Sequence, residues 1–135
     1  GGSAEGTTHE TLAEKRHSVR QEGSAVFKNA INGMTSSATE LLERLNLTVG
    51  DIDWVVPHQA NIRIIDAVGK NLGIAPEKIK VNIERYGNTT AATIPLCLWD
   101  FQNDFMPGDK LLLTAFGAGF TWGSTCVIWG TLRNK

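Results

Sequence analysis

The stretch DIDWVVPHQAN, residues 51–61, gives the clearest indication of the fold. A short apolar run there ends at Pro57, and the polar residues His58, Gln59 and Asn61 follow directly. From 62 to 72, apolar residues recur at the three- and four-residue spacing of an amphipathic helix, with Asn61 as its expected N-cap. We therefore predict a buried strand, a sharp turn and a helix. This places His58 at the carboxyl end of a strand, where open α/β sheets put their ligand crevices.

The rest of the chain alternates between helix and strand patterns. A long amphipathic helix is expected after Ser24, its N-cap, and another helix begins at the polar turn YGNTT, residues 86–90. The other expected elements are a helical turn at 75–77, an extended piece at 81–83, and strands at 110–116 and 122–129 joined by residues 117–120. This order predicts an α/β fold with three layers, α-β-α, and a mixed sheet.

The sequence is interpreted as a short arm followed by one domain. Residues 1–16 are rich in Gly, Thr and charge with no clear period, so we expect a flexible N-terminal arm or loop. Residues 17–135 contain no repeat and no dividing linker, and a short edge strand is expected at 17–21. The chain begins at Gly1 and has methionine only at positions 34 and 106, which indicates a processed product or a piece of a longer protein.

The charge and the cysteines narrow the class of protein. With 13 basic and 14 acidic residues in 135, the chain lacks the bulk charge with which proteins bind nucleic acid or a membrane surface. No apolar run approaches the roughly 20 residues that span a bilayer, and no secretory signal is present. Cys97 and Cys126 lie in apolar surroundings without metal-type spacing, which favours buried thiols, no metal site and a cytoplasmic location.

Two polar side chains stand out at the junctions between elements. His58 and Asn88 lie outside the apolar faces, each just before a predicted helix. An imidazole N–H and an amide N–H aimed at one point would stabilise charge developing on a carbonyl oxygen. Alternatively, Asn88 caps a helix and His58 is a hydrogen-bonded turn residue, and the spacing leaves both interpretations open. The small residues Gly117, Ala118 and Gly119 either let backbone N–H groups approach a ligand or form only a hairpin turn.

Three collinear stretches resemble one family. They are VPHQANIRII (56–65), RYGNTTAATIP (85–95) and PGDKLLLTAFGAGFTWG (107–123). Together they resemble the C-terminal half of β-ketoacyl-acyl-carrier-protein synthase III, a thiolase-fold condensing enzyme that starts bacterial fatty acid synthesis. The resemblance implies one half of a thiolase-like fold, an acyl-CoA and an acyl carrier protein as partners, a homodimeric parent enzyme, and no cofactor beyond the CoA and carrier thioesters that are its substrates.

The resemblance also implies roles for individual residues. In that family a cysteine of the N-terminal half is acylated, and a histidine and an asparagine bind the malonyl thioester carbonyl; by motif these are His58 and Asn88. The loop at 117–119 corresponds to the element that supplies a backbone N–H, here that of Ala118, to the acyl oxyanion. Asn61 corresponds to a position along the pantetheine channel.

Basic residues are expected to form the docking surface for the acidic carrier protein. By resemblance these are Lys28, Arg63 and Lys70, although three ordinary solvated charges would give the same pattern. Asn71 replaces a further basic residue of the family, which weakens the expected patch. Ser24 replaces an asparagine common in the family, which puts one pantetheine contact in doubt.

The nucleophile of the family has no counterpart in this sequence. Neither Cys97 nor Cys126 follows the small-residue pattern of the reactive cysteine, so the chain alone should not condense anything. Two alternatives remain: a carrier-binding module without chemistry, and a thiol hydrolase that pairs one of these cysteines with His58. A related priming synthase with another acyl-CoA would carry the same His–Asn pair.

Overall fold

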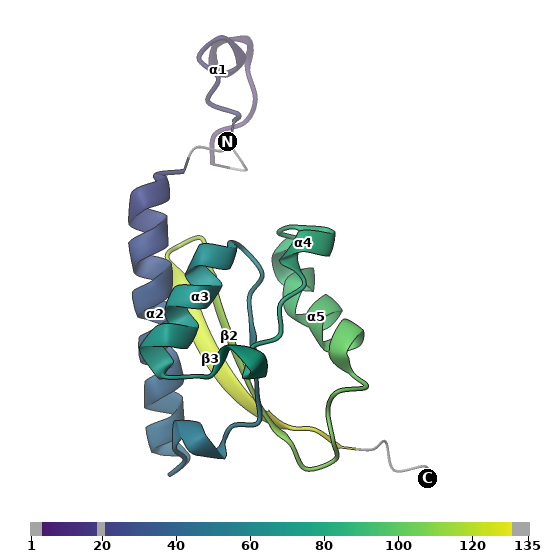
Figure 1. Cartoon of the computed structure of the whole chain (residues 1–135). Helices are drawn as coiled ribbons and strands as arrows, with labels where there is room; N and C mark the ends of the chain where they lie inside the picture. Colours follow the sequence, from purple (N-terminus) through teal and green to yellow (C-terminus); the bar gives the residue numbers. More distant parts are fainter. Residues whose placement is uncertain (1–3, 19–20, 131–135) are drawn as a thin grey trace.

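The computed structural model describes residues 4–18 and 21–130. A three-stranded mixed sheet forms its centre, in the order β1-β2-β3 (Figure 1). Strand β1 (Trp54–Pro57) pairs in parallel with β2 (Lys110–Gly117), and β2 pairs antiparallel with β3 (Thr121–Ile128). An isolated parallel bridge between Val55 and Ile79 lies on the other side of β1. The predicted mixed sheet and its terminal hairpin are therefore confirmed.

Helices cover both faces of this sheet. The long helix α2 (Gly23–Arg44) and helix α3 (Ile62–Leu72) pack on one face, and helix α5 (Thr93–Phe101) packs on the other (Figure 1). A core cluster that includes Met34, Val55 and Val68 fills the first interface. A smaller cluster that includes Val56, Cys97 and Leu111 fills the second. The chain thus has the predicted three α-β-α layers, with β1 buried from both sides as its continuous apolar run requires.

Short helical segments connect these layers. They are α1 (His9–Ala13), η1 (Val49–Asp51), η2 (Pro76–Lys78), α4 (Ile83–Tyr86) and η3 (Thr90–Ala92). The predicted helical turn near Pro76 is confirmed by η2. Helix α3 begins and ends where the sequence indicated: the Asn61 side chain accepts a hydrogen bond from the backbone N–H of Arg63, and Gly73 ends the helix with a φ of 71°.

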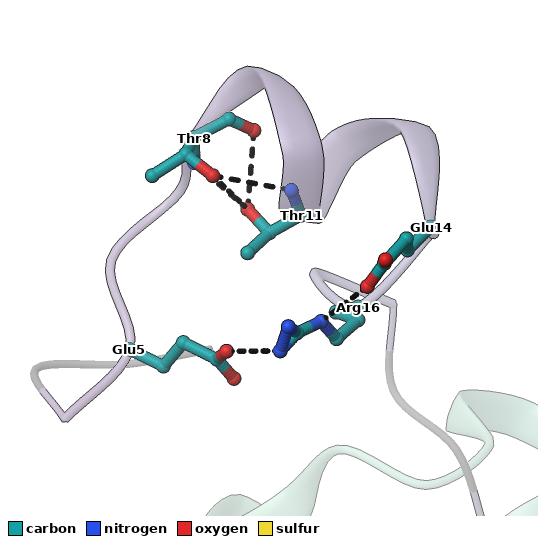
Figure 2. A network of polar contacts seen from close by, with 5 residues as sticks. All are labelled: Glu5, Thr8, Thr11, Glu14 and Arg16. Atoms are coloured by element: carbon teal, nitrogen blue, oxygen red, sulfur yellow. Dashed lines mark hydrogen bonds and ion pairs between the residues drawn. The ribbon is translucent and has the colours of Figure 1, made fainter.

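The N-terminal segment, predicted as an arm or loop, contains a short helix. Residues 9–13 form α1, which lies apart from the three layers in Figure 1. Figure 2 shows why this segment turns: Thr8 and Thr11 form a reciprocal capping box, and Arg16 contacts both Glu5 and Glu14. A local capping motif of two threonines carries no apolar period, so periodicity alone did not reveal it.

Three further predictions need correction. Helix α2 begins at Gly23 with Glu22 at the N-cap and no side-chain cap, so Ser24 is not the cap. The extended piece predicted at 81–83 is cut short, because α4 already begins at Ile83, and the β-bridge of this region lies earlier, at Ile79. Of the edge strand predicted at 17–21, residues 19–20 lie outside the described part, and the described residues on either side form no strand. Within the described ranges, no helix is long and apolar enough to cross a membrane.

Candidate functional site

The sheet places His58 directly after β1. Its backbone N–H donates to the carbonyl oxygen of Thr114 at 2.8 Å, which continues the parallel pairing one residue past the strand. Its Nδ1 lies 2.6 Å from the hydroxyl of Thr93, the first residue of α5. Burial lowers the pKa of His58 below 6.5 because desolvation disfavours the charged imidazolium. At neutral pH the ring is therefore uncharged.

Asn88 lies in the turn between α4 and η3. Gly87 before it adopts a φ of 66°, which a residue with a side chain rarely adopts. The Asn88 Oδ1 accepts a hydrogen bond from the backbone N–H of Thr90 at 2.9 Å. This bond fixes the amide so that Nδ2 remains as its donor end, and no hydrogen bond from Nδ2 is seen within residues 4–18 and 21–130. Asn88 thus closes a turn rather than capping a helix, since Thr89 is the N-cap of η3, and it still has a donor for a ligand.

His58, Asn88 and the 117–119 loop line one open cavity of about 890 Å³. Its apolar walls come from α2, through Ala30 and Met34, and from the hairpin, through residues such as Phe120 and Trp122. Three polar elements that lie far apart in the sequence therefore converge on one apolar hollow, as ligand sites usually combine them.

The loop between β2 and β3 contributes backbone rather than side chains. Gly119 has a φ of 143°, and a Cβ there would lie 2.8 Å from Thr121 Cγ2. The hydroxyl of Thr121 donates to the carbonyl oxygen of Ala118 at 3.1 Å, which helps to hold the loop. Glycine is therefore required at position 119 for the loop to take this form.

Comparison with known proteins identifies the family. The family model for the C-terminal part of 3-oxoacyl-[acyl-carrier-protein (ACP)] synthase III matches residues 42–129. The chain belongs to this synthase III family. The β-ketoacyl-[acyl-carrier-protein] synthase III of Porphyromonas gingivalis is 57% identical over 129 residues, covering 96% of this chain and 38% of that protein. The chain thus spans well under half the length of the relatives it matches.

Solved structures show the same fold. The synthase III of Thermus thermophilus has a TM-score of 0.79 at 44% identity, over 82% of this chain and 35% of that one. The priming β-ketosynthase of the R1128 polyketide pathway has a TM-score of 0.78 at 30% identity, over 92% of this chain and 39% of that one. The chain is therefore the C-terminal half of a thiolase-like synthase III fold, as its motifs indicated.

One polar residue joins the segments that carry His58 and Asn88, and the sequence analysis did not single it out. The Gln59 side chain is 1% exposed, and its Nε2 donates to the carbonyl oxygens of Pro57 and Lys80 at 2.7 and 3.2 Å. Its Oε1 accepts from the backbone N–H of Asn82 at 3.1 Å. Gln59 therefore ties the segment before Asn88 to the segment that carries His58.

A second set of contacts continues from Asn82 to α4. Asp100 accepts hydrogen bonds from the side chains of Asn82, Arg85 and Tyr86 at 2.9–3.0 Å. The bond from Asn82 is the main reason why the pKa of Asp100 lies below its usual value. Although Gln59 adjoins His58 in the sequence, its partners Lys80 and Asn82 lie more than 20 residues away, so no local pattern reveals this network.

The remaining predicted site residues lie on the surface rather than in the cavity. Asn61 is exposed at the start of α3, although Ala60 before it lines the cavity. Lys28, Arg63 and Lys70 are exposed on α2 and α3. The Arg63 guanidinium lies 5.2 Å from the ring centre of Phe27, the neighbour of Lys28. Lys70 is seven residues along α3 from Arg63, about 10 Å along the helix axis.

Neither described cysteine is suited to nucleophilic attack. Cys97 is 0% exposed in the core, and burial raises its pKa to about 12. Cys126 is half-buried, and burial raises its pKa as well. Because the thiolate is the nucleophile, both side chains stay in the unreactive form near neutral pH. The high pKa values of the two thiols argue against the thiol hydrolase. In the described part of the chain, no group of three potential metal ligands occurs.

Proposed function

We propose that this chain is the C-terminal catalytic half of a 3-oxoacyl-ACP synthase III that acts in the cytoplasm. The complete enzyme would condense an acyl-CoA, with acetyl-CoA as the expected donor, with malonyl-ACP to start fatty acid synthesis. The observation that supports this most is the convergence of His58, Asn88 and the 117–119 loop on one cavity.

The proposed reaction uses His58 and Asn88 as hydrogen-bond donors to one oxygen. The malonyl thioester carbonyl binds between His58 Nε2–H and Asn88 Nδ2–H. When the bond to the carboxylate breaks, CO₂ leaves and the electron pair moves into the thioester, so that negative charge develops on this oxygen. Two preorganised donors in a largely apolar hollow stabilise that charge more than water would.

The second half of the reaction needs a residue from outside this chain. The enolate carbon attacks the acyl carbon of an acyl-cysteine, a carbon–carbon bond forms, and the cysteine leaves as thiolate. We propose that the backbone N–H of Ala118 stabilises the tetrahedral oxyanion of that step. The high pKa of Cys97 supports the view that the cysteine comes from the missing N-terminal half and that this chain alone is inactive.

The carrier protein would dock on the exposed cations. Lys28, Arg63 and Lys70 lie on α2 and α3, and Met34 and Ile64 on the same two helices line the cavity. We propose that this surface binds the acidic carrier while its pantetheine arm enters beside Asn61. The parent enzyme is expected to be a homodimer, as the family resemblance implies.

The low reactivity of the two cysteines favours a second candidate function, a carrier-binding module. A chain whose described cysteines are both poor nucleophiles could bind the carrier protein without performing chemistry. The complete protein, incubated with acetyl-CoA and malonyl-ACP, distinguishes the two functions. A condensing enzyme forms 3-oxoacyl-ACP and releases CO₂, whereas a binding module forms a complex and no product. The same assay with longer acyl-CoAs identifies the acyl donor.

A further inference from the structure

The hydroxyl of Thr93 has one proton and lies within hydrogen-bond distance of two groups. Its Oγ1 is 2.6 Å from His58 Nδ1 and 3.1 Å from the carbonyl oxygen of Thr90. If the proton points to Thr90, the hydroxyl oxygen must accept from Nδ1–H, and Nε2 of a neutral ring then has no proton. If the proton points to Nδ1, the ring proton is on Nε2.

The two distances favour the bond to the histidine. A typical O–H···O bond is about 2.5–3.0 Å long, so the contact to Thr90 is long. Bonds donated by an N–H to oxygen are typically about 2.7–3.2 Å long, so the contact to Nδ1 is shorter than a bond from Nδ1–H would usually be. The Thr90 carbonyl does not need this proton, because it already accepts the backbone N–H of Thr93 at the end of η3. Thr93 itself is 2% exposed, so water does not compete for the hydroxyl.

We propose that Thr93 is a positioning residue that selects the tautomer of His58 by donating its hydroxyl proton to Nδ1. The neutral ring then carries its proton on Nε2, the nitrogen left for a ligand in the cavity that His58 lines. This inference rests on the proposed function, in which Nε2 must donate to the thioester oxygen. A ring with the opposite tautomer would present a lone pair and would repel that oxygen.

The backbone around Thr90 supports this role. Thr90 has a φ of 55°, which is unusual for a β-branched residue, and its N–H binds the Asn88 side chain. One strained residue therefore holds the amide of Asn88 and adjoins the hydroxyl that orients His58. Such strain persists where the surrounding structure requires a particular geometry.

The test is the position of the ring proton in the complete protein labelled with nitrogen-15 histidine. Nitrogen shifts of the ring distinguish the two tautomers, and the His58 signals are those lost in His58→Gln. We expect Nε2–H in the unsubstituted protein and in Thr93→Ser, which keeps the hydroxyl. In Thr93→Val, which removes only the hydroxyl, we expect a mixture of tautomers and a fall of about tenfold in kcat for malonyl-ACP decarboxylation with little change in KM.

Thr35→Val is the matched control. The Thr35 hydroxyl is buried on α2 and has no hydrogen-bond partner among the described residues, so its loss should change neither the tautomer nor kcat. A ring proton found on Nδ1 in the unsubstituted protein would overturn the proposal, as would Thr93→Val with unchanged tautomer and kcat. If the proton is on Nε2 but the protein does not condense, the proposed function fails and the tautomer assignment stands.

Discussion

At the scale of single residues, the site depends on an uncharged histidine and an oriented amide. Burial lowers the pKa of His58, and the Thr93 hydroxyl occupies its Nδ1. The amide of Asn88 is fixed by the backbone of Thr90. Both side chains therefore have one end committed to the protein and one end free for a substrate oxygen.

The lowered pKa of His58 predicts a dependence of stability on pH. Between the folded-state pKa and the ordinary value near 6.5, the unfolded chain binds more protons than the folded chain. The free energy of unfolding should therefore fall as the pH drops through this range. In His58→Gln this contribution is absent. As the pH is lowered from about 8 to about 5, the unsubstituted protein should therefore lose more unfolding free energy than the variant does. Urea titrations that give the same difference at every pH would contradict the assigned cause.

At the scale of elements, Gln59 determines how the two site segments lie together. Gln59→Leu keeps a similar volume but leaves the N–H of Asn82 and the carbonyl oxygen of Lys80 without this partner. We expect a loss of about 1–3 kcal/mol in the free energy of unfolding. Amide hydrogen exchange at residues 80–88 should also become faster.

A second glutamine gives the control for that variant. The Gln102 side chain donates to the carbonyl oxygen of Trp99 at 2.9 Å near the end of α5 and joins no two segments. Gln102→Leu should therefore change stability little and leave exchange at residues 80–88 unaltered. Equal effects of the two substitutions would show that Gln59 has no special role in joining the site.

The elements also show what a sequence can predict. The strand, turn and helix from β1 to α3 were predictable because periodicity and the Asn61 and Gly73 end signals agree locally. Helix α4 has four residues, too few for a period, and the contact between His58 and Thr93 joins residues 35 positions apart. His58 and Asn88 were found by motif, whereas Thr93 and Gln59 act through partners that only the folded chain brings near.

At the scale of the whole molecule, several large apolar side chains are exposed to solvent. Trp99, Met106 and Ile128 are 70%, 67% and 68% exposed. The curated relative from Porphyromonas gingivalis is matched over only 38% of its length. We expect the missing part of a longer protein, or another copy of this chain, to cover such apolar side chains.

The exposed apolar residues predict self-association of the isolated 135-residue chain. Light scattering during gel filtration should give a mass above that of a monomer, and the double substitution Trp99→Gln with Ile128→Thr should lower it. The complete protein should show no such effect of these substitutions if its remaining part covers both side chains. A monodisperse monomer of the unsubstituted isolated chain would contradict this interpretation.

CO₂ release from malonyl-ACP by the complete protein tests most directly whether His58 and Asn88 stabilise the enolate. The assay compares the unsubstituted protein with His58→Ala, Asn88→Ala and the double variant. If both side chains donate to one oxygen, each single substitution should slow decarboxylation by about 10²–10³-fold, and the double variant should be little slower than either. Single variants that release CO₂ within about threefold of the unsubstituted rate would show that this pair does not stabilise the enolate.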